Sequence, residues 1–390
     1  MRKNSIFFLF FFFIAMVFFP TNAADERKDT WPMYGCTSSG TRANLGETLA
    51  RPPYEVVWEK EENINFVSEP IIAMDNVYII NENKELLAYK IKTGNLSWIF
   101  PHYETFWEPV YDQGRLYALT KEGTLFALDA STGEEYWTKL LDDNFIHPPL
   151  LCDRRLYLLA KKSIGIEFYV INPANGQIIW KKPIQHVHTN SFAVNEKIIC
   201  FTTFDENDKS GLFNEVIALS VKDGKILWKT KINGANHPII NMGVVLVGSS
   251  NYYFYALNEL TGEKIWRLKL EGNSNHYCSY YNYAIINTNT GKIYAVDILK
   301  GKMYWTATSG GNTSYIFSAN GMAYFRSFYP LAGRDILSGA IFSADKAMFE
   351  SVLLEKYKNY SKFASIGLNH LVAVGKNTLA VFKAAGGSIK

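Results

Sequence analysis

The stretch 108–140 alternates short apolar runs with turn residues and predicts one small antiparallel sheet. The apolar and β-branched runs are 109–112, 115–120, 124–129 and 134–140. The breaks between them end in Gly114, Gly123 and Gly133. Runs of this length, separated by such residues, are typical of strands joined by tight hairpins. The stretch therefore predicts a four-stranded meander with two apolar faces.

The same pattern recurs along most of the chain. Six times a glycine precedes a tryptophan by four residues: Gly94/Trp98, Gly133/Trp137, Gly176/Trp180, Gly224/Trp228, Gly262/Trp266 and Gly301/Trp305. Successive tryptophans of this set are 38 to 48 residues apart. A period near forty indicates an array of small sheets. Since a sheet with two apolar faces must pack against its neighbours, the array predicts the blades of a β-propeller.

The repeated glycine and tryptophan have structural explanations. We expect the glycine in the left-handed region of a bulged hairpin, where a β-carbon would clash. The tryptophan lies in the fourth, outermost strand, where a large ring fills the widening gap between blades. We therefore predict a structural docking role for seven tryptophans: Trp58, Trp98, Trp137, Trp180, Trp228, Trp266 and Trp305.

Two further units and an N-terminal strand complete the predicted ring. A weak seventh unit covers 313–356 and has Val352 at the position of the tryptophan. The eighth unit begins at Phe363 and lacks a fourth strand. Trp58 precedes Trp98 by one repeat and has no earlier strand to pair with, so its segment should complete the last blade and remove exposed sheet edges. The sequence predicts an all-β, eight-bladed propeller of four-stranded antiparallel blades, or seven blades without the weak unit.

The repeat resembles a known family. Its Ala-x-x-x-x-x-Gly-x-x-x-Trp pattern is similar to the tryptophan-docking repeat of quinoprotein-type (PQQ-like) β-propellers, and the lead-in at 31–35 and 41–44 resembles theirs. The resemblance covers about residues 30–390. That superfamily includes PQQ-dependent dehydrogenases, the lipoprotein of the outer-membrane barrel-assembly machine and binding modules without catalysis. The resemblance therefore implies the fold and leaves the function open.

The first residues predict export. A basic start, an apolar run over 6–19 and small residues at Thr21 and Ala23 are typical of a secretory signal peptide. An uncleaved anchor is the alternative, although the run is short for a full span. We predict a signal peptide at 1–23, a lead-in segment at 24–50 and the propeller at 51–390. The mature protein should be periplasmic or secreted, without a stable membrane anchor, because no cysteine for lipid attachment follows closely.

Charge and cysteines restrict the partners. Without Arg2 and Lys3 the chain has 38 basic and 37 acidic residues, and no Lys/Arg cluster. This balance argues against nucleic acid or an anionic membrane surface as a partner. The four cysteines allow up to two disulfides in three pairings, or remain buried thiols.

The sequence predicts no catalytic residue, metal or cofactor. Quinoprotein dehydrogenases usually hold PQQ with adjacent cysteines, a Ca²⁺ cluster and a catalytic aspartate in long insertions, whereas this chain has no adjacent cysteines and short connections. The acidic run 205–208 lacks the glycine and spaced glutamate of a calcium loop and fits a solvated loop tip. A zinc site at His186 and His188 would need a third ligand that the sequence does not supply. PQQ with Ca²⁺ remains the alternative.

The loops that lead into the innermost strands should converge on one mouth of the channel. Their candidate binding residues are Glu69, Trp107, Glu108, His147, Asn190, His237, Tyr277 and Tyr315. These side chains either cap the channel or recognise a peptide, a protein loop or a glycan. We predict a monomeric, non-catalytic scaffold for a protein or peptide partner, by analogy in cell-envelope assembly. The alternatives are a PQQ/Ca²⁺-dependent oxidoreductase and a carbohydrate-binding module.

Overall fold

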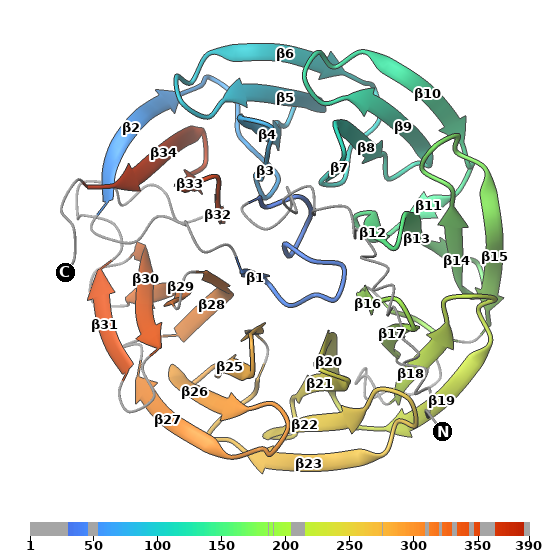
Figure 1. The fold of residues 1–390 in the computed structure, drawn as a ribbon, viewed down its shortest axis with the longest axis vertical. Coiled ribbons are helices and arrows are strands. Elements are labelled where there is room, and N and C mark those ends of the chain that lie inside the picture. The colour runs from blue at the N-terminus through green and yellow to red at the C-terminus, as the bar shows by residue number, and fades with distance from the viewer. Residues whose placement is uncertain are drawn as a thin grey trace, which may run out of the picture.

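The chain forms a ring of antiparallel sheets around a central axis. The computed structural model describes residues 30–45, 54–185, 187–189, 191–203, 215–274, 276–308, 312–319, 322–329, 334–342, 347–351 and 363–385. Over these ranges the strands make eight sheets, arranged as blades around the axis (Figure 1). The predicted eight-bladed all-β propeller is confirmed, and the weak seventh unit is a blade.

Each blade runs outward from the axis in chain order. Blades 1 and 2 consist of β3 (Ile71–Ala73), β4 (Asn76–Ile80), β5 (Glu85–Lys90), β6 (Leu96–Pro101), β7 (Val110–Asp112), β8 (Arg115–Leu119), β9 (Thr124–Asp129) and β10 (Glu135–Leu140). Blades 3 and 4 consist of β11 (Asn144–Phe145), β12 (Leu150–Cys152), β13 (Arg155–Lys162), β14 (Gly165–Ile171), β15 (Ile178–Ile184), β16 (Phe192–Val194), β17 (Ile198–Thr203), β18 (Glu215–Ser220) and β19 (Ile226–Lys231).

The remaining blades follow the same plan. Blades 5 and 6 consist of β20 (Ala235–Asn241), β21 (Val244–Ser249), β22 (Tyr253–Asn258), β23 (Lys264–Lys269), β24 (His276–Tyr280), β25 (Tyr283–Asn287), β26 (Lys292–Asp297) and β27 (Met303–Thr308). Blades 7 and 8 consist of β28 (Asn312–Ala319), β29 (Met322–Tyr329), β30 (Arg334–Phe342), β31 (Ala347–Ser351), β32 (Phe363–Gly367), β33 (His370–Val374) and β34 (Thr378–Ala384), joined by β2 (Tyr54–Glu61).

The N-terminal strand closes the ring. β2 pairs antiparallel with β34, from Tyr54 opposite Ala384 to Glu61 opposite Thr378, so the first and last strands of the propeller lie side by side (Figure 1). Trp58, in the same strand β2, then joins blade 8 to blade 1, because its indole N–H donates to the carbonyl of Ile91 at 2.7 Å. Blade 8 is thus assembled from both ends of the propeller sequence and is tied to blade 1.

At six of the blade junctions that the structure describes, a tryptophan docks one blade onto the next. Each of the six repeat glycines has a φ of +66° to +76°, and a β-carbon there would lie 2.5–3.0 Å from the indole of the preceding blade. The indole N–H of the same tryptophan donates, at 2.7–3.2 Å, to the carbonyl three residues before that glycine. The six docking pairs are Trp58–Gly94, Trp98–Gly133, Trp137–Gly176, Trp180–Gly224, Trp228–Gly262 and Trp266–Gly301. Glycine is therefore required twice, for its backbone conformation and for the close approach of the ring.

Blade 3 departs from the regular plan. Its innermost strand is divided into β11 and β12, which both pair with β13. Pro148 and Pro149 lie between the two pieces. Because proline has no N–H to donate, the ladder cannot continue through them. The interruption places His147 beside the axis.

Buried apolar residues form several clusters along the ring. The second and third strands of the blades are almost wholly buried, as in β4, β9 and β14, while outermost strands such as β10 and β19 are mostly exposed. Cys36, Cys152, Cys200 and Cys278 are all free thiols. In the part of the chain that the structure covers, no helix is long and apolar enough to cross a membrane.

Candidate functional site: the axial channel

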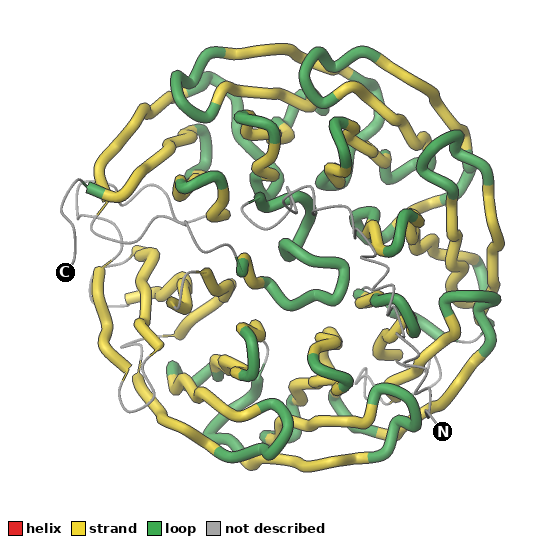
Figure 2. Tube along the Cα trace, in the orientation of Figure 1, coloured by secondary structure: helices red, strands yellow, loops and turns green. Residues whose placement is uncertain are grey.

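Residues 30–45, the described part of the lead-in segment, cross the centre of the ring; they are called the segment below. The segment runs as a loop across the axis and ends in β1 (Ala43–Asn44), which pairs in parallel with β28 (Figure 2). Six of the innermost strands each donate one backbone N–H, at 2.7–3.0 Å, to a carbonyl of the segment. The donor–acceptor pairs are Ile72–Trp31, Tyr111–Pro32, Val194–Ser38, Ile240–Ser39, Ser279–Thr41 and Ser318–Arg42. Asn44 adds blade 8, because its side chain donates to the carbonyl of Ile366 at 2.9 Å.

Glu69 is the main acceptor for the segment's side chains. The indole N–H of Trp31 donates to its Oε1 at 2.7 Å, and Nη1 of Arg42 lies 3.9 Å from its Oε2. Only 1% of Glu69 is exposed. The backbone N–H of Glu69 donates in turn to Oε1 of Glu108 at 3.1 Å, and burial raises the pKa of Glu108. Two predicted binding residues are therefore engaged by the protein's own chain and by each other.

Arg42 carries the positive charge of this cluster. Its Nη2 donates to the hydroxyl of Tyr34 at 2.8 Å, and its guanidinium lies 5.0 Å from the centre of the Tyr34 ring. Tyr34 meets the imidazole of His147 edge to face at 5.8 Å. The segment thus places an indole and a guanidinium against Glu69 and a phenol against His147.

Three histidines around Arg42 are held neutral. Burial, together with the charge of Arg42, lowers the pKa of His147 to about 4, of His237 to about 3 and of His276 to about 4. Nδ1 of His147 donates to the carbonyl of Pro148 at 2.7 Å, because a carbonyl can only accept. The ring of His237 stacks on Tyr277 at 4.3 Å, and the Tyr277 hydroxyl donates to the carbonyl of His237.

The other predicted residues are less central or lie outside the described residues. Trp107 donates from its indole to the carbonyl of Phe145 at 3.1 Å, and Nζ of Lys121 lies 4.5 Å from the centre of its ring. Tyr315 belongs to β28, and only its backbone is described. Asn190, His186 and the acidic run 205–208 lie outside the described ranges.

Sequence reasoning missed the role of Trp31, Tyr34 and Arg42 in the channel. The signal was present, because Trp31, Tyr34 and Arg42 stand in a segment without strand periodicity, and the inner strands offer Glu69 and several histidines. Composition alone could not show that this segment enters the channel. The contacts require the fold.

The donor set of the channel does not fit a bound quinone. PQQ carries several carboxylates, whereas the wall offers neutral histidines, and Arg42 is already within 3.9 Å of Glu69. The two amide atoms of Asn287 and Nε2 of His237 are buried without a hydrogen bond. Within the described ranges no group of three or more His, Cys, Asp and Glu side chains could hold a metal ion.

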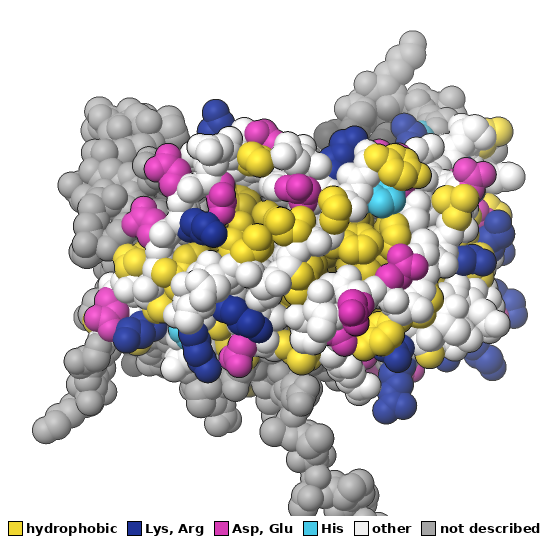
Figure 3. All heavy atoms as spheres, turned by 90° about the horizontal axis from the view of Figure 1, so that it is seen from above, with side chains coloured by type: hydrophobic (Ala, Val, Ile, Leu, Met, Phe, Trp, Pro, Cys, Tyr) yellow, Lys and Arg dark blue, Asp and Glu magenta, His cyan; other side chains and the backbone are white. Residues whose placement is uncertain are grey.

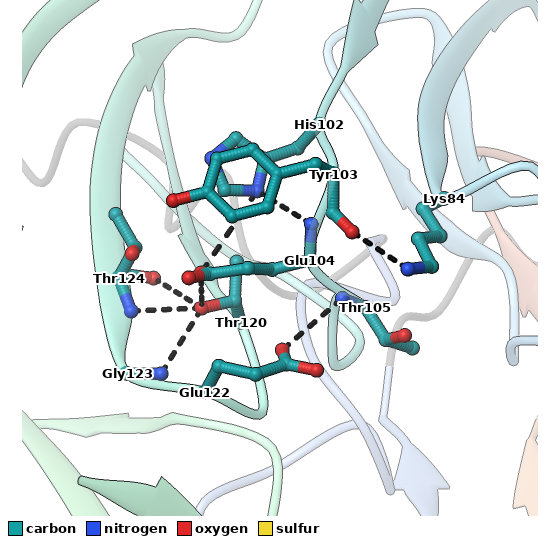
Figure 4. Close-up of polar contacts among 9 residues, drawn as sticks. All are labelled: Lys84, His102, Tyr103, Glu104, Thr105, Thr120, Glu122, Gly123 and Thr124. Carbon is teal, nitrogen blue, oxygen red and sulfur yellow. Dashed lines mark hydrogen bonds and ion pairs between the residues drawn. The ribbon is translucent and has the colours of Figure 1, made fainter. Parts of the chain in front are cut away.

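A second polar cluster lies where β6 leads toward β7, away from the axis (Figure 4). Thr120 donates to Oε2 of Glu104 at 2.6 Å and accepts the backbone N–H groups of Gly123 and Thr124. Lys84 donates to the carbonyl of Tyr103 at 2.6 Å. The Thr120 bonds fix the β8–β9 hairpin against the connection between blades 1 and 2, and Lys84 ties the β4–β5 hairpin to the same connection. The cluster is explained by this structural task.

The outer edge of blades 1 and 2 carries exposed apolar side chains, and we call this surface the apolar rim. Figure 3 shows hydrophobic side chains in a central band, between Lys, Arg, Asp and Glu. The outermost strands contribute Leu96 and Ile99 from β6, and Tyr136 and Leu140 from β10. Because these side chains are exposed, the apolar rim is part of the surface that is open to contact by a partner.

Replacing Arg42 by glutamine should raise the pKa values of His147, His237 and His276. Burial of the imidazoles is the first cause of their low pKa, and the nearby guanidinium lowers it further. Removing that charge relieves only the second cause. Titration of the histidine ring protons by NMR measures the change. His370 is the control, because its low pKa comes from burial, Lys92 and Lys383. Unchanged values at all three histidines would contradict the placement of Arg42.

The chain matches a known family over more than half of its length. The family PQQ_2, outer membrane protein assembly factor BamB, matches residues 101–169 and 166–319. The chain therefore belongs to this family of PQQ-like β-propellers.

The curated relatives are distant and are matched only in part. Tetrathionate hydrolase of Acidithiobacillus ferrooxidans is 24% identical over 59% of this chain and 49% of its own. BamB of Yersinia pestis is 25% identical over 52% of this chain and 44% of its own. BamB of Moranella endobia is 22% identical over 70% of this chain and 72% of its own. The first two matches thus span about half the length of the relative.

Solved structures share the fold at low identity. BamB from Moraxella catarrhalis has a TM-score of 0.61 at 14% identity, over 85% of this chain and 99% of its own. A quinohemoprotein alcohol dehydrogenase from Pseudomonas putida HK5 has a TM-score of 0.66 at 11% identity, over 93% of this chain and 81% of its own. The computationally designed Ika8 protein has a TM-score of 0.65 at 11% identity, over 86% and 99%. These likenesses concern the fold alone.

Proposed function

We propose that this chain is a non-catalytic propeller scaffold that binds a protein partner during outer membrane protein assembly. The observation that carries the proposal is the BamB family match over more than half of the chain. The apolar rim of β6 and β10 and the short connections between blades support it, since they suit a rigid surface for a partner. The scaffold acts outside the cytoplasm, in the periplasm, as a monomer and without a cofactor.

An oxidoreductase that uses PQQ and Ca²⁺ is the second candidate. It is favoured by the fold likeness to the quinohemoprotein alcohol dehydrogenase. Against it stand the absence of adjacent cysteines in the sequence and the channel, whose axis is filled by Trp31, Tyr34 and Arg42. A carbohydrate-binding module is a third possibility, to which no contact of the described residues gives support.

Restoration of outer membrane assembly tests the scaffold role. We expect the exported chain, expressed in a bacterium that lacks its own BamB, to raise the amount of folded outer membrane proteins. The designed Ika8 propeller, exported in the same way, is the control, because it shares the fold and not the family. Recovery no better than with Ika8 would overturn the proposal.

Calorimetric titration with PQQ, with and without Ca²⁺, tests the second candidate. We expect no heat of binding and no change in the PQQ absorption spectrum, because Arg42 on the axis already contacts Glu69 and Tyr34. Tight binding that requires Ca²⁺ would contradict the cofactor-free scaffold and would direct the search to alcohol and sugar oxidation.

A further inference from the structure

We propose that the axial channel is a peptide-binding site, which the chain fills with its own residues 30–45 and which can accept the same extended sequence from outside. The occupant is therefore a segment with an indole, a phenol and a guanidinium at the positions of Trp31, Tyr34 and Arg42. This inference does not depend on the role in outer membrane protein assembly.

The segment is not needed to close the ring. Closure comes from β2, which begins at Tyr54 and pairs with β34 along its length. Six of the blade junctions are also made by tryptophans, from Trp58 to Trp266. Residues 30–42 contribute no strand to any blade, and β1 adds only two residues beside β28. The walls of the channel are thus built without the segment.

The segment is held as peptides are held at sheet edges. The innermost strand of each blade is an edge strand, and its N–H groups that face the axis need acceptors. The carbonyls of the segment supply one acceptor to each of six such strands, at 2.7–3.0 Å. Main-chain bonds of this kind give affinity in strand-addition complexes, whereas side-chain pockets give specificity.

Two side chains of the segment, those of Trp31 and Arg42, meet the channel wall at one carboxylate, that of Glu69. The indole of Trp31 is fully buried, meets Phe317 edge to face at 5.3 Å and donates to Glu69. The guanidinium of Arg42 lies 3.9 Å from the same carboxylate and bonds Tyr34. Tryptophan, tyrosine and arginine are the residues that most often dominate binding energy at interfaces. Glu69, a predicted binding residue, thus becomes the anchor for both ends of the occupant.

Cleavage of the full chain tests whether the segment is a separable ligand. A protease site placed between Leu45 and Tyr54 allows the segment to be cut after folding. We expect the cut segment to co-elute with the ring in size-exclusion chromatography and to be replaced by a fluorescent peptide of residues 30–45 added in excess. If the ring unfolds as the segment leaves, or stays folded and fails to bind the labelled peptide, the proposal is wrong.

A paired substitution tests whether the added peptide occupies the channel. We expect the R42Q peptide to bind the cut ring about tenfold more weakly than the natural peptide, in line with the loss of one buried charged contact. In a ring that carries E69Q, the same change should cost much less, because the carboxylate that pairs with Arg42 is gone. Equal losses in both rings would place the peptide elsewhere and overturn the assignment.

Discussion

Replacing Trp228 by alanine is expected to lower the free energy of unfolding by about 3–5 kcal/mol, the usual cost of removing a buried tryptophan. The indole packs on Gly262, where a β-carbon would lie 2.5 Å from its ring, and donates to the carbonyl of Glu259 at 2.9 Å. Its loss opens a cavity between blades 4 and 5 and leaves that carbonyl without its partner. Urea unfolding, followed by tryptophan fluorescence and circular dichroism, measures the change.

Two further variants separate packing from hydrogen bonding. Trp228→Phe keeps a ring against Gly262 and loses the N–H donor, so its cost should be smaller than that of alanine. Ile226→Ala, in the same strand and 47% exposed, should change the free energy of unfolding by roughly 0.5 kcal/mol or less. A loss at Trp228→Ala as small as that of Ile226→Ala would show that the indole does not join the blades.

Acid is expected to destabilise the propeller through its channel histidines. In the folded state His147 and His276 have pKa values of about 4 and His237 of about 3, against about 6.5 in the unfolded chain. The unfolded state therefore binds more protons, and stability that is fully present above pH 6.5 is lost as the pH falls toward 4. The loss amounts to about 2 kcal/mol for each histidine at pH 5.

The charged groups around the three histidines determine how the stability changes with pH. Arg42 opposes protonation of all three rings, while the carboxylates of Glu69 and Glu108 lie on the same axis. The raised pKa of Glu108 acts in the opposite direction, because its folded form takes up a proton more readily as the pH falls. Urea midpoints at pH 7.5 and pH 5 measure the balance. His276→Asn should reduce the dependence on pH, and the same dependence as in the natural chain would refute this explanation.

The periodic part of the fold could be predicted from the sequence because one local unit repeats. The runs around 109–140 correspond to β7–β10 within one or two residues, and the spacing of Trp58 from Trp98 predicted the strand that completes blade 8. In blade 7 the strand pattern persists after the tryptophan is lost, so its blade forms without that residue. Because the same strand pattern recurs along the chain, even a weak copy of it, as in blade 7, could be recognised as a blade.

The sequence predicted where the candidate site lies, and it did not predict what fills it. The loops that lead into the inner strands do bring Glu69, Glu108, His147 and His237 to the axis. What occupies the axis has no period, because the printed main-chain bonds of residues 30–45 reach six of the blades at irregular intervals along the segment. Such contacts depend on where distant strands lie after the ring has closed. Local pattern cannot report them.

Ring closure has a consequence for how the protein folds as it is made. β2 pairs with residues 378–384, so the earliest strand of the propeller waits for nearly the whole chain before it can complete its sheet. Contacts of such long sequence separation form slowly. Until the last strand arrives, β2 has an unsatisfied edge, and such edges invite pairing with other chains. The interval before closure is therefore the period in which this protein is most exposed to aggregation and proteolysis.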